Sequence, residues 1–89
     1  SATPEYEISA FPNPATEQFQ LEMKNFEEGI YQARLVDVTG RIVFSEGLNV
    51  DNVNTKTFTI ETSNISIGLY ILTIQRGSFT FRDRIFIGK

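Results

Sequence analysis

The chain of 89 residues contains no cysteine, no histidine and no tryptophan. Without cysteine it has neither a disulfide framework nor a thiolate metal site. Without histidine it lacks the commonest general base and the commonest metal ligand. Its apolar runs are only a handful of residues long, far short of the ~20 residues that a membrane-spanning helix needs. We therefore expect no catalytic residue, no metal or cofactor site and no transmembrane segment.

The net charge is mildly acidic, −3, but the charged residues are unevenly distributed. Acidic side chains dominate residues 1–28, whereas basic side chains outnumber acidic ones in residues 76–89. The basic end is either a polar surface for a partner or one of two solvated strand faces of opposite sign. The acidic balance, without a basic stripe of interleaved aromatic residues, argues against nucleic acid as a partner.

Apolar and polar residues alternate along most of the chain, which is the period of half-buried β-strands. Phe19, Leu21 and Met23, for example, alternate with glutamine and glutamate. Short strands separated by turn signals predict an all-β fold, an immunoglobulin-like antiparallel β-sandwich of about seven strands. A small β-barrel is the alternative. The expected strands cover residues 6–10, 18–23, 30–36, 42–46, 57–60, 69–74 and 79–87.

The turns have recognisable sequence signals. Asp37 can bond backbone amides at the start of a turn and Gly40 can take positive φ at its end, so residues 30–46 read as a hairpin. Residues 76–77 are expected to turn the chain into the last strand, and residues 49–54 to form a polar loop.

Gly68 and Tyr70 stand where a late strand begins. This spacing suits a tyrosine corner, in which the phenol bonds a backbone group a few residues upstream. We expect Gly68 to supply a tight turn there. Tyr70 is therefore expected to have a structural role rather than to bind a ligand.

The last expected strand has one apolar face and one basic face. A terminal strand of this kind can pair as an edge and offer side chains to a partner. The alternative is an ordinary closing strand whose arginines coat the surface. One face carries Phe79, Phe81, Ile85 and Ile87 with Asp83 among them, and the other carries Thr80, Arg82, Arg84 and Phe86.

Three patterns give weak indications of chemistry. Glu27 and Glu28 are adjacent, so on a strand they would point to opposite faces, and a solvated loop is favoured over a carboxylate pair. Residues 51–54 offer oxygen atoms to calcium but lack the glycine and terminal glutamate of an EF-hand loop. Residues 64–66 match an N-glycosylation sequon, which matters only in a glycosylating host.

Four segments that occur in order point to a family. Together they resemble the type A C-terminal sorting domain of the type IX (Por) secretion system, over about residues 6–89. The resemblance implies an immunoglobulin-like sandwich at the C-terminus of a Gram-negative protein that reaches the periplasm by a signal peptide. The segments are Phe11–Thr16, Tyr31–Arg41, Ile60–Tyr70 and Arg84–Lys89.

The resemblance also implies the partners and the path of export. The type IX translocon and an outer-membrane shuttle protein would recognise the folded domain and carry a fused N-terminal cargo to the cell surface or the medium. A sortase-like cysteine peptidase would then typically remove the domain. The chain is accordingly expected to be a piece of a longer precursor, with residues 1–5 as a linker remnant and 6–89 as the sorting domain.

The resemblance assigns residues to two groups. Arg84 stands where lysine is commoner, which keeps the charge but changes the hydrogen-bond geometry. The strand implied to contact partners is Arg82, Arg84, Ile85, Phe86, Ile87, Gly88 and Lys89. The implied structural motif residues are Pro12, Asn13, Pro14, Asp37, Gly40, Gly68 and Tyr70.

Other functions stay open at this point. An immunoglobulin-like carbohydrate-binding or adhesion module of a secreted protein is the first alternative, although the chain has no tryptophan and its aromatic residues are expected mostly in the core. A structural spacer is the second. An enzyme is the weakest reading, because a nucleophile needs a base within reach and none is apparent.

Overall fold

The structure is a computed structural model that describes residues 6–13, 15–51 and 54–88. These residues form seven β-strands and no helix, so none of them belongs to a helix that could cross a membrane. All seven strands lie where the alternation of the sequence predicts them, which confirms the all-β fold. The strands are β1 (Glu7–Phe11), β2 (Gln18–Lys24), β3 (Gly29–Val36), β4 (Ile42–Val50), β5 (Thr55–Glu61), β6 (Gly68–Arg76) and β7 (Phe79–Ile87).

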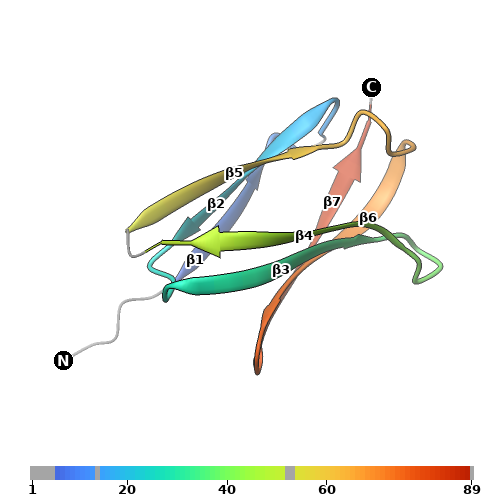
Figure 1. Ribbon diagram of the computed structural model, residues 1–89. Helices are drawn as coiled ribbons and strands as arrows, with labels where there is room; N and C mark the ends of the chain where they lie inside the picture. The colour runs from blue at the N-terminus through green and yellow to red at the C-terminus, as the bar shows by residue number, and fades with distance from the viewer. Residues whose placement is uncertain (1–5, 14, 52–53, 89) are drawn as a thin grey trace.

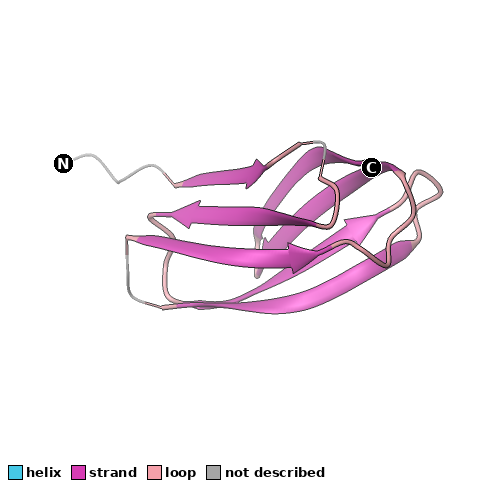
Figure 2. Ribbon diagram, turned by 90° about the horizontal axis from the view of Figure 1, so that it is seen from above, coloured by secondary structure: helices cyan, strands magenta, loops and turns pink. Residues whose placement is uncertain are grey.

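The strands form two sheets that pack as a sandwich rather than closing into a barrel. One sheet has the order β1-β2-β5 and the other the order β4-β3-β6-β7, with antiparallel pairing throughout (Figure 1). The chain passes between the sheets after β2, β4 and β5, and the two layers are visible from above in Figure 2. The fourth strand is bonded to β3, whereas the constant-type immunoglobulin fold places it in the other sheet.

The core lies between the sheets and is built by the alternating residues. In β2 and β3 every second side chain is buried, and the residues between them face outward. Full burial of such a side chain is worth ~1.5–3 kcal/mol relative to exposure. The largest side chains with less than 2% exposure are Phe19, Leu21, Met23, Leu35, Leu48, Ile60, Leu72, Ile74, Ile85, Ile87, Val50 and Thr62.

Strand β4 is longer than the sequence predicted. It continues to Val50, which pairs with Gly29 and is 1% exposed, so part of the expected polar loop 49–54 belongs to the sheet. The apolar Val50 follows the alternation of β4 and fills a core position, which overrides the polar composition around it. Residues 52–53 lie outside the described part of the chain.

Strand β7 is the edge of the four-stranded sheet, because it pairs only with β6. Within the described part of the chain, the outer edge of β7 pairs with another segment at its C-terminal end only. There Ala15, which precedes β2, forms an isolated parallel bridge with Ile87.

Candidate functional site

The register of the strands gathers the motif residues at one end of the sandwich. Val36 pairs with Ile71, so the turn after β3 lies beside the start of β6, and Gly68 pairs with Ile87 at the end of β7. We call this region the motif end. It comprises residues 12–13, 37–41, 66–70 and 85–88, which lie far apart in the sequence.

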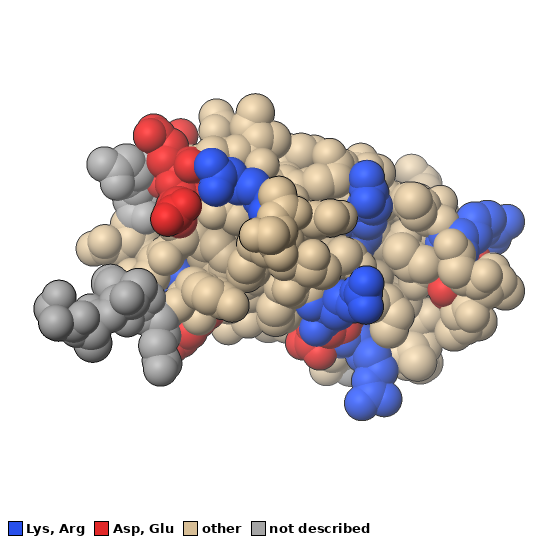
Figure 3. Space-filling view, turned by 90° about the horizontal axis from the view of Figure 1, so that it is seen from below, with Lys and Arg blue, Asp and Glu red and all other residues tan. Residues whose placement is uncertain are grey.

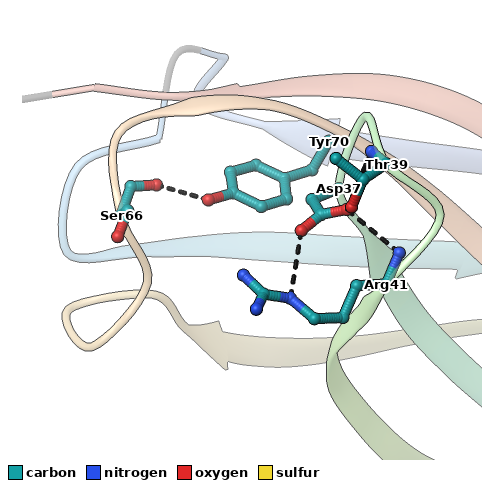
Figure 4. Close-up of polar contacts among 5 residues, drawn as sticks. All are labelled: Asp37, Thr39, Arg41, Ser66 and Tyr70. Carbon is teal, nitrogen blue, oxygen red and sulfur yellow. Dashed lines mark hydrogen bonds and ion pairs between the residues drawn. The ribbon is translucent and has the colours of Figure 1, made fainter.

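Asp37 organises the turn between β3 and β4 (Figure 4). Its Oδ1 accepts bonds from the Thr39 hydroxyl at 2.6 Å, the Thr39 amide at 2.9 Å and the Arg41 amide at 3.0 Å. Its Oδ2 lies 3.2 Å from Nε of Arg41. The Thr39 hydroxyl bond first, and then the Arg41 amide bond, lower the pKa of Asp37 below its ordinary value of 3.8. Gly40 closes the turn at φ 92°, as the sequence predicted.

Tyr70 forms the predicted tyrosine corner. Its hydroxyl donates to the carbonyl of Ser66 at 2.7 Å, four residues upstream (Figure 4). The expectation for Gly68 is wrong, because the described glycines with positive φ are Gly29, Gly40 and Gly77. A Cβ on Gly68 would lie 3.7 Å from the Tyr70 ring, an ordinary contact. The bond of Tyr70, rather than the backbone freedom of glycine, holds this crossover.

The segment before β2 is bonded to the end of β7. Asn13 Oδ1 accepts the amide of Phe86 at 3.0 Å, and the Ala15 amide donates to the Phe86 carbonyl at 2.8 Å. The Gly88 amide donates to the Ala15 carbonyl at 2.7 Å. The peptide bond before Pro12 is cis, and Pro14 lies outside the described residues. The sequence predicted only a turn for this motif. Its contact with a strand 73 residues away could not be predicted from the neighbouring residues.

The residues of the predicted contact strand divide into two sets. Ile85 and Ile87 are 1% and 0% exposed, so their side chains belong to the core. Arg82, Arg84 and Phe86 point outward, and Phe86 is 45% exposed. Gly88 is held by Ala15 as described above, and Lys89 lies outside the described residues. Among the described residues of this strand, the outward set is the one that offers side chains to a partner.

A shallow groove of about 550 Å³ lies beside these outward residues. Its walls come from three strands of the four-stranded sheet. Asp83 is also among the lining residues, and its Oδ1 accepts the amide of Arg84 at 2.8 Å. The lining residues are Val36, Ile71, Thr73, Arg82, Asp83 and Arg84.

The opposite end of the sandwich is closed by aromatic side chains. Tyr31 donates its hydroxyl to the carbonyl of Glu27 at 2.9 Å, again four residues upstream, a bond that the sequence analysis missed. Phe26 and Phe79 pack edge-on to each other and to Tyr31, with centroids 5.5–6.2 Å apart. We call this the aromatic end: residues Tyr6, Phe26, Tyr31, Arg76 and Phe79.

The aromatic end also holds charged groups and a cavity. The guanidinium of Arg76 lies 5.5 Å from the Tyr31 ring centroid and 3.6 Å from a Glu27 carboxylate oxygen. A cavity of about 240 Å³ opens between these groups and Tyr6. Glu27 therefore forms an ion pair with Arg76. The described residues contain no group of three side chains suited to hold a metal ion.

The comparison with protein families agrees with this arrangement. A search of curated proteins finds no match. The model of the secretion system C-terminal sorting domain matches residues 9–88, which includes every strand except the first residues of β1. The matched region spans both the motif end and the edge strand β7, and the family is one of sorting signals rather than catalysts. The chain therefore belongs to the type IX secretion C-terminal sorting domains.

Proposed function

We propose that the type IX translocon and an outer-membrane shuttle protein read this domain through the outward side chains of β7. These are Arg82, Arg84 and Phe86. The cargo is fused upstream and crosses the outer membrane of a Gram-negative cell from the periplasm to the surface or the medium. The domain itself performs no chemistry on the cargo. Its role is that of an address.

The observation that carries the proposal is the convergence of the motif residues on β7. Asn13 and Ala15 bond Phe86 and Gly88 from one side, while β6 pairs with β7 on the other. The end of β7 is thus held on both sides as an exposed, rigid strand. A rigid surface loses little conformational entropy on binding, which favours recognition.

Ile85 and Ile87 are buried, so they support recognition indirectly by holding β7 in place. They anchor β7 in the core, and the alternation of the strand then directs Arg84 and Phe86 outward. Deletion of residues 85–89 would remove two core side chains together with the exposed ones. A truncated domain would therefore lose its fold, so substitution of outward residues is the cleaner test of recognition.

The position of the first strand supports a cargo at the aromatic end. Tyr6, just before β1, packs against Phe79 at the start of β7, with ring centroids 5.1 Å apart. β1 then runs toward the motif end, where Ala15 meets Ile87. A cargo joined upstream of Tyr6 would leave the motif end and the outward side of β7 accessible.

Removal of the domain by a sortase-like cysteine peptidase is part of the proposal. The predicted linker, residues 1–5, and the cleavage position lie outside the described residues. In cells that lack the active peptidase, the cargo should keep the domain attached, as a mass increase of about the 10.1 kDa of this chain. Cargo of unchanged mass in such cells would contradict cleavage but not sorting.

The test of sorting is a fusion of residues 1–89 behind a periplasm-targeted fluorescent reporter. The fusion should reach the surface or the medium in cells with a working type IX system and stay in the periplasm in cells without the translocon. A reporter without the domain should stay inside both. Retention of the folded fusion in the competent cells would contradict the proposal.

The cavity at the aromatic end supports one second candidate function, carbohydrate binding. Aromatic rings beside Arg76 and Glu27 offer both stacking and hydrogen-bonding groups to a sugar. Calorimetric titration of the purified chain with soluble glucans, mannans and bacterial surface polysaccharide tests it. Saturable binding that Tyr6→Ala abolishes would support this function, and no heat above dilution would exclude it for these glycans.

A further inference from the structure

The basic side chains of the domain differ in whether they have an acidic partner. Of the seven that the structure describes, four form ion pairs: Lys24 with Glu22, Arg41 with Asp37, Lys56 with Asp51 and Arg76 with Glu27. The other three, Arg34, Arg82 and Arg84, have no ion pair among the described residues.

These three arginines share the outer face of the four-stranded sheet. Arg34 pairs with Thr73, which pairs with Arg82, so the three residues form one row across β3, β6 and β7. Val36, Ile71 and Arg84 form the next row. With strands ~4.8 Å apart and ~7 Å between alternate residues, the arginines mark a triangle ~10 Å by ~7 Å.

An apolar floor lies beside this triangle, in the same row as Arg84. Val36 and Ile71 are half-buried and line the groove that Arg82 and Arg84 border. Beyond it Leu69 pairs with Phe86, and these side chains are 39% and 45% exposed. Cations beside an apolar floor are complementary to a partner that offers both carboxylates and apolar groups.

The outer face of the other sheet has a different composition. Its outward residues in β1, β2 and β5 are mostly glutamine, threonine, serine and glutamate, with Lys24 beside Glu22. The three unpaired arginines are thus confined to one face. One view of the molecule shows most of its visible basic side chains over the right half, with some acidic atoms among them, and an acidic cluster beside a basic side chain at the left (Figure 3).

We propose that the outer face of the four-stranded sheet, with Arg34 as well as β7, receives an extended acidic segment of a partner protein. Carboxylates two residues apart on an extended chain are ~7 Å apart, which matches the spacing of Arg82 and Arg84. Apolar side chains of the segment cover Val36 and Ile71. The negative charge of Asp83, which stands between Arg82 and Arg84 along β7 and also lines the groove, disfavours a uniformly anionic occupant. This proposal rests on the proposed sorting function and names the chemistry of its partner.

Export of the reporter fusion carrying Arg34→Glu tests the inference. Arg34 lies on β3, away from the outward side chains of β7 that the proposed sorting function uses, so its substitution tests the part of the face that this inference adds. We expect the exported fraction to fall on the order of tenfold, the effect of losing a central contact. Lys24→Glu is the control, because it makes the same change of charge on the other sheet, and it should leave export unchanged.

The outcomes separate this inference from the sorting function. If the unsubstituted fusion is exported and Arg34→Glu is exported equally well, the inference is wrong and the sorting function stands. If the unsubstituted fusion stays inside, the sorting function itself fails. Circular dichroism of the purified variant shows whether it folds.

A second measurement decides the inference even if Arg34→Glu does not fold. A photoreactive benzophenone side chain at Thr73, in the middle of the arginine row, should crosslink in cells to an acidic peptide of an outer-membrane protein, identified by mass spectrometry. The same side chain at Thr57, which faces outward on β5, should not. A crosslinked peptide without acidic residues, or equal crosslinking from both positions, would overturn the proposal.

Binding to lipid vesicles tests whether an anionic membrane, rather than an acidic protein segment, occupies this face. The purified chain should sediment no more with phosphatidylglycerol-containing vesicles than with phosphatidylcholine vesicles. Binding to the anionic vesicles that Arg34→Glu abolishes would assign the face to lipid and contradict a protein occupant.

Discussion

The two ends of the sandwich use the same hydrogen bond in different surroundings. At each end a tyrosine on the four-stranded sheet donates to a carbonyl four residues upstream, Tyr70 to Ser66 and Tyr31 to Glu27. Around Tyr70 the contacts are directional: the bonds of Asp37 and of Asn13. Around Tyr31 they are packed rings.

The difference indicates how each end is specified. Hydrogen bonds fix distances and angles, so the motif end has a defined shape that a partner can read. Contacts between packed aromatic rings depend less on exact direction than hydrogen bonds do. Such contacts suit the end of the sandwich where an upstream chain joins. The following variants test this comparison, from the largest expected effect to the smallest.

The first variant separates packing from polar contact at the motif end. Ile87→Ala should lower the free energy of unfolding by about 2–5 kcal/mol, because a fully buried aliphatic side chain is lost. Phe86→Ala, one position away but exposed, should change it by about 0.5 kcal/mol or less. Urea denaturation measures both. Equal losses would contradict the division of β7 into an inner and an outer side.

The second pair compares the two tyrosines directly. Tyr70→Phe and Tyr31→Phe keep the ring and remove the hydroxyl, so each should cost about 1 kcal/mol. The tyrosines lie about six residues apart along the sheet, or ~20 Å, so the double variant should show the sum of the two losses. Non-additive losses would mean that the ends are coupled.

The third pair concerns the two glycines of the motif end. Gly40→Ala should cost about 1 kcal/mol, because φ 92° strains any side chain. Gly68→Ala should cost about 0.5 kcal/mol or less, since the new methyl meets Tyr70 at ordinary contact distance. Thermal unfolding would reveal the order, and a larger loss for Gly68→Ala would restore the role that the sequence suggested.

The smallest effect concerns the charge of Asp37. Since the pKa of the folded carboxyl lies below 3.8, its stabilisation is present above that value and is lost as the pH falls through the lowered pKa. Wild type should therefore exceed Asp37→Asn in stability at neutral pH, and the gap should shrink in acid below pH 3.8. Urea midpoints at both pH values measure it. A stability difference between wild type and Asp37→Asn that does not change with pH would mean that the geometry of the Asp37 hydrogen bonds, and not the charge of its carboxylate, causes it.

Local rules predicted much of the fold. Alternation placed all seven strands, and the turn chemistry of Asp37 and Gly40 is present as expected. The Tyr70 bond was predictable because its partner is four residues away. Gly68 was misjudged, because a glycine in a recognised motif can serve without positive φ.

The parts that sequence did not predict depend on tertiary placement. Asn13 meets Phe86 across 73 residues, and no local pattern carries that pairing. Which arginines lack acidic partners also depends on the register of β3, β6 and β7. The family resemblance grouped Ile85 and Ile87 with the exposed arginines, whereas the alternation of the strand placed them on its apolar face, and the structure buries them.

The central claim is that partners read the outward side of β7. The most direct measurement is the exported fraction of the reporter fusion carrying Arg82→Gln and Arg84→Gln, beside a control carrying Lys24→Gln and Lys56→Gln. Both lose two positive charges, the control on the other sheet. The account predicts export lower by on the order of tenfold for the β7 variant and unchanged export for the control, with equal melting temperatures. Equal export of the two folded variants would contradict it.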